Sequence, residues 1–270
     1  MSTLAERLKR IVRGDVATDA DTLKKYSRDT SIFSKTPEVV VFPKDTADVT
    51  SVVRYAYEAR GRGEEVSVTP RSAGTDMTGG PLTDSISLVF TKYMNRILKL
   101  DTDTVTAEPG IYYRDLEKET LRKTGKLFPS YPASREICAF GGMLANNAGG
   151  ELTLRYGKTE RYVREMHVIL SDGSAAHIRP LNPEELADKE REQTLEGQIY
   201  RGIHRLIDEH AEAIETARPS VTKNSAGYSL WNVMDQEEKT FDLGRLIIGS
   251  QGTLAIITDA TVGMVELKKH

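Results

Sequence analysis

Three glycine-rich loops, each beside a short apolar run, constrain the fold of this chain more than any other feature of its sequence. They are PRSAGTDMTGG (70–80), AFGGMLANNAGG (139–150) and GSQGTLAIIT (249–258). Because glycine has no Cβ, such loops let several backbone N–H groups approach a phosphate or a flat ring. None has the spacing of a Walker loop or a Rossmann turn. One such loop could be a tight connection that binds nothing, but three favour a long ligand held at several points.

Polar side chains in the loops suit the same purpose. The hydroxyls of Thr75 and Thr78 can bond a phosphate. Asn146 and Asn147 carry amides that both donate and accept, as the edge of a nucleotide or flavin ring requires. The alternative is that these two amides only bond the backbone of their own loop. The loops therefore predict a ligand but do not identify it.

The sequence before the first loop predicts a parallel βαβ unit. PEVVVFP (37–43) and EEVSVTP (64–70) are typical of short buried strands. Between them, an apolar helix face follows a cap at Asp45 or Thr46 and contains Val49, Val52, Val53 and Ala56. A strand, a helix and a second strand favour parallel pairing. Residues 1–28 predict one or two short surface helices.

Hairpins and helices are expected in the rest of the chain. The predicted strands are 85–90, a hairpin within 94–110 that turns at Asp101 to Asp103, a hairpin at 165–178 around Asp172-Gly173, and two runs within 244–267. The predicted helices are Tyr113 to Gly125, 183–197 and 199–214, and 129–150 is expected to be rich in loops. The fold class is therefore α+β.

Composition excludes several classes of site. The net charge of −3 gives no electrostatic reason to expect nucleic acid or an anionic membrane as partner. Cys138 is the single cysteine, so neither an internal disulfide nor a four-cysteine metal site can form within the chain, and the five histidines lack HExxH spacing. No apolar run approaches the roughly 20 residues of a membrane span, and the N-terminus has no apolar signal core. We expect a cytoplasmic protein without a metal site.

Motifs in a fixed order point to a family. They are YSRDTSIF (26–33), PEVVVFPKDTADV (37–49), PRSAGTDMTGG (70–80), FPSYPASREICAFGGMLANNAGG (128–150), LRYGKTERYV (154–163), TKNSAGYSLW (222–231) and IIGSQGTLAIITDATV (247–262). In this order they resemble the FAD-binding, PCMH-type domain of the vanillyl-alcohol-oxidase-type flavoproteins. Within that family, the sequence is most similar to the glycolate oxidase D-subunit and D-lactate dehydrogenase group.

The resemblance implies FAD as cofactor and assigns residues to it. Those expected around the pyrophosphate are Pro70, Arg71, Ser72, Ala73, Gly74, Thr75, Asp76, Met77 and Gly79. Those expected along the adenosine, ribityl and flavin path are Pro132, Ala133, Ser134, Ala139, Gly141, Gly142, Asn146, Asn147, Ala148 and Gly149. Those expected to complete the site are Gln251, Gly252, Thr253, Leu254, Ile256 and Ile257.

Three departures from the family pattern affect the cofactor. Thr75 stands where relatives with covalently attached FAD often carry histidine, so non-covalent FAD is expected. Asp76 replaces a small residue, and a carboxylate at 4 Å from a phosphate charge costs about 1 kcal/mol in water and about 4 kcal/mol at intermediate dielectric. Gln251 and Ala255 replace the usual Glu and Gly, which is tolerable unless the backbone at 255 needs a positive φ.

The resemblance also implies two lobes, residues 1–97 and 98–270, with FAD between them. In the family a further cap domain supplies the base, the carboxylate-binding arginine and any metal ligands, and this sequence stops at LKKH. We therefore expect an FAD module that acts on a D-2-hydroxy acid only with such a cap, and no catalytic residue is named. Three alternatives stay open: a cofactor-binding or electron-transfer subunit completed by another chain, a short reductase like UDP-N-acetylmuramate dehydrogenase, and a fragment that folds without cofactor.

Overall fold

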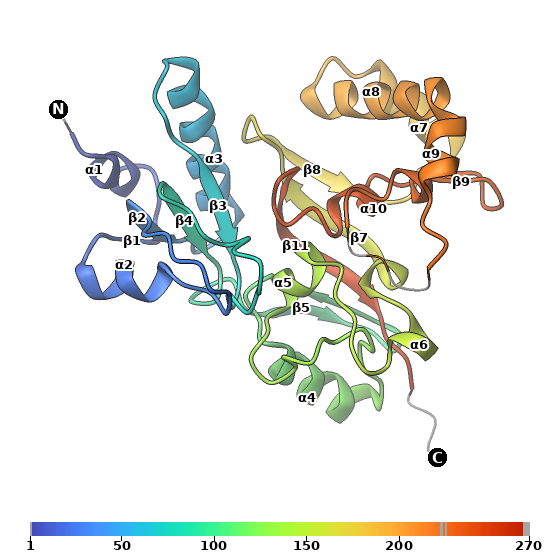
Figure 1. Cartoon of the computed structure of the whole chain (residues 1–270), viewed down its shortest axis with the longest axis horizontal. Helices are drawn as coiled ribbons and strands as arrows, with labels where there is room; N and C mark the ends of the chain where they lie inside the picture. The colour runs from blue at the N-terminus through green and yellow to red at the C-terminus, as the bar shows by residue number, and fades with distance from the viewer. Residues whose placement is uncertain (1, 222–223, 225, 267–270) are drawn as a thin grey trace.

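The chain folds around two β-sheets that stand side by side, as the computed structural model in Figure 1 shows for residues 2–266 except 222, 223 and 225. The strands are β1 Asp15–Ala17, β2 Val39–Phe42, β3 Val68–Arg71, β4 Ile86–Val89, β5 Ile97–Leu100, β6 Thr104–Ala107, β7 Val163–Ile169, β8 Ala175–Ile178, β9 Met234–Asp235, β10 Thr240–Phe241 and β11 Ile256–Gly263. The helices are α1 Leu4–Lys9, α2 Ala20–Tyr26, α3 Thr46–Gly61, α4 Tyr113–Thr124, α5 Phe140–Ala145, α6 Thr153–Tyr156, α7 Pro183–Arg191, α8 Leu195–Glu209, α9 Ala211–Ala217 and α10 Gly244–Ile247, with 3₁₀ turns at Thr159–Arg161 and Leu230–Asn232.

The first sheet has the order β1-β2-β4-β3. Its strands β2 and β3 both pair with β4 in parallel, so β4 lies between the two strands that α3 connects. The predicted helix begins where expected, because the Asp45 side chain accepts a hydrogen bond from the N–H of Asp48. Its buried face includes Val49, Val52, Val53 and Ala56, as their spacing predicts. The parallel βαβ prediction is confirmed, with one strand inserted.

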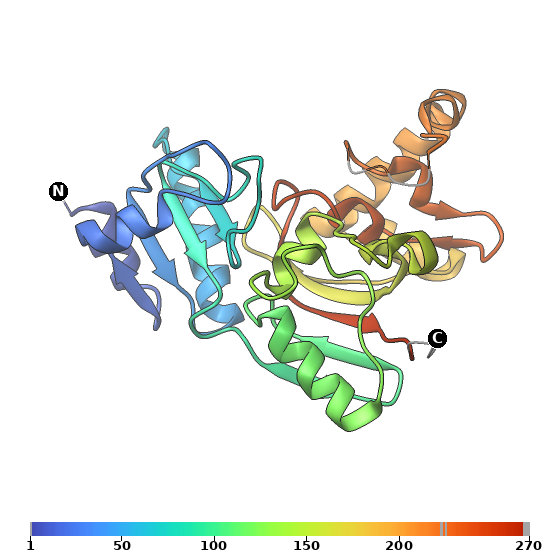
Figure 2. The ribbon, with the colours of Figure 1, turned by 60° about the horizontal axis from the view of Figure 1, so that its bottom comes forward.

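The second sheet is antiparallel and has the order β5-β6-β11-β7-β8. The two predicted hairpins, β5–β6 and β7–β8, are confirmed. The last strand, β11, lies between them, with Ala260 opposite both Ala107 and Met166. Figure 2 shows α4 beside the strands of this sheet, where Tyr113 and Leu116 enter its core. Together the two sheets give the predicted α+β, two-lobed fold.

One core cluster joins the two lobes. Ile169 of β7 and Ile256 of β11 pack in the same cluster as Val39, Leu88 and Phe90 of the first lobe. The second sheet begins at Ile97 with β5. Because the first core draws residues from both ranges, the division between residues 97 and 98 stays a prediction. No helix in the described part of the chain is long and apolar enough to cross a membrane.

Some local predictions are wrong. The run that starts at Gly244 is the helix α10 and not a strand, because the Asp242 carboxylate accepts the Gly244 N–H at 2.8 Å and begins a turn there. The loop-rich segment 129–150 contains α5. The predicted helix 183–197 ends at Arg191, and α8 begins after Thr194, whose hydroxyl accepts the Gly197 N–H. The N-terminal segment contains β1 besides its two short helices.

Candidate functional site

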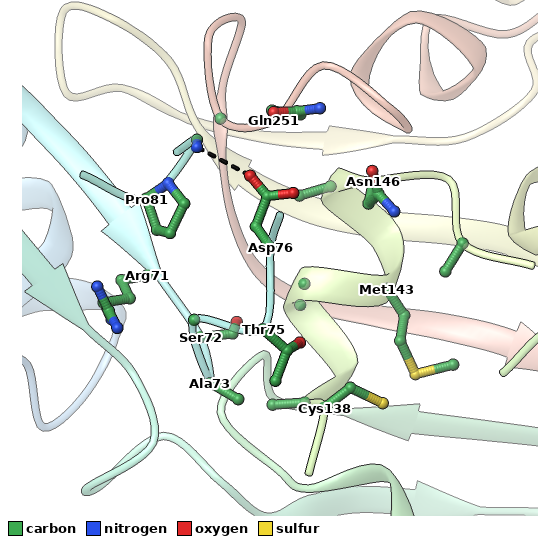
Figure 3. Close-up of a pocket in the computed structure, with 18 of the residues that line it drawn as sticks. Arg71, Ser72, Ala73, Thr75, Asp76, Pro81, Cys138, Met143, Asn146 and Gln251 are labelled. Carbon is green, nitrogen blue, oxygen red and sulfur yellow. Dashed lines mark hydrogen bonds between the residues drawn. The ribbon is translucent and has the colours of Figure 1, made fainter. Parts of the chain in front are cut away.

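A cavity of about 480 Å³ lies between the two sheets. Both lobes line it, and its size falls within the roughly 300–1,000 Å³ of small-molecule sites. Figure 3 shows the first glycine-rich loop (residues 70–80, loop one) on one side and α5 on the other, with Gln251 of the third glycine-rich loop above them. The three glycine-rich loops, far apart in the sequence, therefore meet at one cavity.

Most of the predicted site residues line this cavity. They are Pro70, Arg71, Ser72, Ala73, Gly74, Thr75, Asp76, Met77, Pro132, Ala133, Ser134, Ala139, Gly141, Gly142, Asn146, Ala148, Gln251, Gly252 and Ile257. The predicted residues that the structure places outside the lining are Gly79, Asn147, Gly149, Thr253, Leu254 and Ile256. Residues 222, 223 and 225 of the TKNSAGYSLW motif lie outside the described residues.

Loop one presents unbonded backbone donors. None of the N–H groups from Ala73 to Thr78 donates a hydrogen bond to another residue that the structure describes. Gly74 has a φ of 73°, and a Cβ there would lie 2.2 Å from the Arg71 Nη2. Successive free N–H groups in such a turn form a concave site for an anion.

Arg71 lies behind loop one. Its guanidinium is buried and donates hydrogen bonds to the carbonyls of Tyr26 and Arg28, at 3.3 and 2.7 Å. In Figure 3 its side chain points away from α5. Burial lowers the pKa of the Arg71 guanidinium, which still stays charged at neutral pH. No ion pair within the described part of the chain includes Arg71. The cavity wall therefore holds a positive charge without a carboxylate partner.

Hydrogen bonds to the Asp76 side chain close the end of loop one. Its Oδ2 accepts the Gly80 N–H at 2.8 Å and the Thr78 hydroxyl at 2.6 Å. From outside the cavity lining, Asp29 accepts the Gly79 N–H at 3.0 Å. A Cβ on Gly80 would lie 2.7 Å from the Gln251 Oε1 and 2.8 Å from the Asp76 Oδ2. Loops one and three therefore meet at Gly80, where a side chain would displace the Gln251 amide or the Asp76 carboxylate.

The second loop approaches loop one through α5. A Cβ on Gly141 would lie 2.5 Å from the Pro109 Cβ and 2.7 Å from the Ser72 Oγ. The segment before α5 is held at Arg135, which donates two hydrogen bonds to the Glu117 carboxylate, at 2.6 and 3.1 Å. This ion pair stabilises the conformation of the cavity wall formed by 132–139.

The two adjacent asparagines behave differently. Asn146 lines the cavity, whereas Asn147 has a φ of 47° and is buried. The Asn147 side chain donates to the Glu160 carboxylate at 2.7 Å and accepts the Glu160 N–H at 3.1 Å. Both hydrogen-bonding ends of the Asn147 amide are thus used within the protein. Of the pair, only Asn146 lines the cavity.

The third loop is fixed to the end of α5. The N–H groups of Gly249 and Gln251 donate to the carbonyls of Leu144 and Ala145, at 3.0 and 2.9 Å. Gln251 has a φ of 54°, and a Cβ on Gly252 would lie 2.5 Å from the Pro70 Cγ. Ala255 has no positive φ, so alanine is compatible with the backbone there.

Comparison with known proteins identifies the family of this chain. A family model described as "FAD binding domain" matches residues 37–179, more than half of the chain. This chain belongs to that family. The chain is also 34% identical over 259 residues to a D-2-hydroxyglutarate dehydrogenase of Pantoea ananatis, covering 95% of this chain and 25% of that protein. It is 29% identical to the glycolate oxidase subunit GlcD of Bacillus subtilis, covering 89% of this chain and 40% of that protein.

A solved structure shows the same fold. An alkyldihydroxyacetonephosphate synthase superposes with a TM-score of 0.67 at 19% identity, over 98% of this chain and 40% of that one. The FAD-binding domain thus spans a quarter to less than half of the length of these three proteins.

Sequence reasoning missed part of the lining of the FAD-binding domain. The missed residues are Thr30, Pro81, Phe90, Pro109, Met143, Ala145, Ile247 and Ser250. Recognition of α5 would have added Met143 and Ala145, which lie one turn from Asn146 and Gly142. Thr30 belongs to the YSRDTSIF motif, which does not assign it to the site; it enters the site because its hydroxyl and N–H bond the carbonyl of Asp76.

Cys138, the single cysteine of the chain, lines the cavity. Burial raises the pKa of the Cys138 thiol to about 11, so it stays protonated at neutral pH. Within the residues that the structure describes, no group of three or more His, Cys, Asp or Glu side chains is placed to hold a metal ion.

Proposed function

We propose that this chain binds FAD non-covalently in the cavity between its sheets, as the flavin-binding module of an oxidoreductase that acts on D-2-hydroxy acids. Bound FAD would supply the redox chemistry, while the protein supplies binding, orientation and electrostatics. Membership of the FAD-binding family supports the cofactor, and the names of the relatives support the substrate class.

One observation carries the proposal. The N–H groups from Ala73 to Thr78 donate no hydrogen bond within the described residues, and these residues line a cavity with the guanidinium of Arg71, which has no carboxylate partner, behind them. Buried charges are normally paired, and a diphosphate would provide the missing negative charge. The gap between loop one and α5, kept narrow by Gly141, would continue the path toward Asn146. The residues present therefore fit FAD.

Two residues support non-covalent binding. Thr75 lies in the cavity lining and, by the resemblance to relatives with covalently attached FAD, stands where they often carry histidine; a hydroxyl forms no histidyl link. Cys138 is the single thiol, and its raised pKa leaves almost no thiolate to attack a flavin ring. Acid denaturation should therefore release all of the flavin.

The described cavity lining supports a module rather than a complete active site. Its ionisable side chains are Arg71, Asp76 and Cys138, and it includes no histidine or lysine. Arg71 is committed to two backbone carbonyls, and Cys138 is protonated at neutral pH. Oxidation of a hydroxy acid needs a base over the flavin and a hydrogen-bond donor that binds the carboxylate of the substrate. We propose that other parts of the enzyme supply them.

The visible spectrum of the purified chain, followed by titration with FAD, FMN and NAD, tests the proposal. We expect FAD to bind much more tightly than FMN, because FMN lacks the AMP half that the loops would contact. NAD should not compete, since the chain has no Rossmann fingerprint. Equal affinity for FAD and FMN would contradict the assignment of residues 70–79.

The substrate class is tested with the same protein. Dithionite should reduce the bound flavin and dioxygen should reoxidise it. D-2-hydroxyglutarate, D-lactate and glycolate should leave its absorbance unchanged under anaerobic conditions. Loss of the flavin band with any of them, at about 1 s⁻¹ or faster, would show a complete active site within these residues.

A further inference from the structure

The two carboxylate oxygens of Asp76 have different surroundings. Oδ2 accepts hydrogen bonds from the Gly80 N–H and the Thr78 hydroxyl. Oδ1 has no hydrogen-bond partner among the residues that the structure describes, and Asp76 lines the cavity. Figure 3 shows one oxygen at the bond to Gly80 and the other directed toward α5. The carboxylate is thus fixed by one oxygen and presents the other to the cavity.

No cation among the described residues forms an ion pair with this second oxygen. Asp76 takes part in no ion pair within the described part of the chain. The one cationic side chain in the lining, Arg71, donates to carbonyls on the far side of loop one. Rotation of the carboxylate is restricted because its Oδ2 is tied to Gly80 beside Gln251. An ionised carboxylate only accepts hydrogen bonds, so a ligand that displaces water from Oδ1 must bring a donor of its own.

A bound diphosphate cannot be that donor, because its oxygens are acceptors at neutral pH. The free N–H groups of loop one begin at Ala73, three residues before Asp76. A phosphate held there would place the neighbouring part of the ligand beside residue 76. In FAD, sugar hydroxyls lie on both sides of the diphosphate, on the ribityl chain and on the ribose.

We propose that Asp76 is a specificity-determining residue that accepts a hydrogen bond from a sugar hydroxyl adjacent to the diphosphate of the cofactor. This inference rests on the proposed function. The sequence alone suggests that this carboxylate repels the cofactor. In the proposed arrangement the free N–H groups bind the phosphate, and the carboxylate accepts a hydrogen bond from the sugar hydroxyl.

Asp76→Asn tests this role most directly. Its amide oxygen can keep the bond from the Gly80 N–H, which then places the amide NH₂ where the free carboxylate oxygen stood. Loop closure is preserved while a charged acceptor becomes a neutral donor. We expect FAD affinity to fall by about ten- to a hundred-fold, the range for hydrogen bonds to charged groups. Simple repulsion between Asp76 and the phosphates predicts the opposite sign, a gain in affinity.

The experiment measures dissociation constants of the wild type, Asp76→Asn and Asp76→Ala for FAD, riboflavin, lumiflavin and ADP, in EDTA and again with Mg²⁺. Asp84→Asn is the matched control, because it removes an exposed charge that pairs with Lys35 outside the cavity lining. Thermal unfolding of each apo variant establishes that it is folded. A loss for riboflavin identifies the ribityl hydroxyls, and a loss for ADP identifies the ribose.

Lumiflavin, which has no sugar, should bind all variants equally, and Asp84→Asn should bind FAD within two-fold of the wild type. A gain in FAD affinity in Asp76→Asn, or unchanged affinity for FAD in both Asp76 variants, would overturn the inference. So would an effect that appears only with Mg²⁺, since the carboxylate would then bind a cation. A wild type that binds none of the four ligands would instead refute the proposed function itself.

Discussion

Gly141 of α5 lies directly against Ser72 of loop one: a Cβ on Gly141 would stand 2.7 Å from the Ser72 Oγ. The same Cβ would be 2.5 Å from the Pro109 Cβ and 2.9 Å from the Pro109 carbonyl oxygen. The Ser72 hydroxyl and the Gly141 N–H both donate to that carbonyl, at 3.0 and 2.8 Å. Loop one and α5 can therefore approach this closely because Gly141 has no side chain.

Gly141→Ala should separate α5 from loop one. Overpacking of this kind costs roughly 1–3 kcal/mol, so we expect the free energy of unfolding of the apo chain to fall by that amount. FAD affinity should also fall, because the cavity walls move. Gly142→Ala is the matched control: its Cβ would meet only the Ser72 Cβ, at 3.8 Å, and alanine favours the helix by roughly 0.5–1 kcal/mol. Urea unfolding of the two apo variants should give shifts of opposite sign, and equal shifts would contradict this account.

The same contact explains which elements the sequence predicts well. Val49, Val52, Val53 and Ala56 reveal α3 because its face is set by local spacing. The glycine pair of α5 disfavours a helix locally, and α5 is helical because its backbone packs tightly against Pro109 and Ser72. That contact joins segments about 70 residues apart in the sequence, so no local pattern contains it.

Long-range pairing explains the other differences. β11 enters the middle of the second sheet between β6 and β7, and nothing in its own sequence specifies these neighbours. Asn147 looks like a ligand residue in its motif, but its amide bonds Glu160, which only the folded chain brings near. The motifs meet at one cavity, whereas the direction of each side chain depends on such partners.

Gly74→Val should abolish FAD binding and also weaken the apo fold. The φ of 73° at Gly74 is in the left-handed region, which costs a β-branched residue roughly 1–3 kcal/mol. Its Cβ would also meet the buried Arg71 guanidinium. In the wild type, FAD at 100 times its dissociation constant should add about 2.7 kcal/mol of stability, and this gain should disappear in the variant.

Gly63→Val separates the two effects of this change. Gly63 has a φ of 83°, a Cβ there would meet nothing within 4 Å beyond its chain neighbours, and the residue lies outside the cavity lining. The variant should therefore show a similar backbone cost while FAD still stabilises it. Thermal melts with and without FAD measure both quantities, and an undiminished gain with FAD in Gly74→Val would show that loop one does not hold the cofactor.

Cys138 should report on the cavity through its pH dependence. Because burial raises the pKa of its thiol to about 11 from an ordinary value near 9, the folded chain holds its proton through a range where the unfolded chain loses it. The resulting stability is complete below pH 9 and is lost as the pH rises toward 11. The unfolding free energy of the wild type relative to Cys138→Ala should therefore decrease across that range.

Alkylation of Cys138 by iodoacetamide checks the same pKa independently. The thiolate reacts, so the rate in the native apo chain should rise about ten-fold per pH unit between pH 8 and 10. FAD should slow it further, since Cys138 lines the cavity. A rate that levels off near pH 9, or one that FAD leaves unchanged, would contradict the position assigned to this thiol.

Arg71 should contribute to FAD binding through its charge and to loop one through its shape. The guanidinium joins loop one to the carbonyls of Tyr26 and Arg28, and it lies over the Tyr26 ring with its Cζ 5.3 Å from the ring centroid. Arg71→Met keeps much of the volume but removes the charge and both hydrogen bonds, whereas Arg71→Lys keeps the charge and loses the planar fork.

If the charge attracts the diphosphate, FAD affinity should fall by roughly ten-fold or more in Arg71→Met and clearly less in Arg71→Lys. Riboflavin has no phosphate, so its affinities for Arg71→Met and Arg71→Lys should differ much less than the FAD affinities of the two variants do. Equal losses of FAD affinity in the two variants would show that Arg71 acts only by holding the loop to residues 26–28.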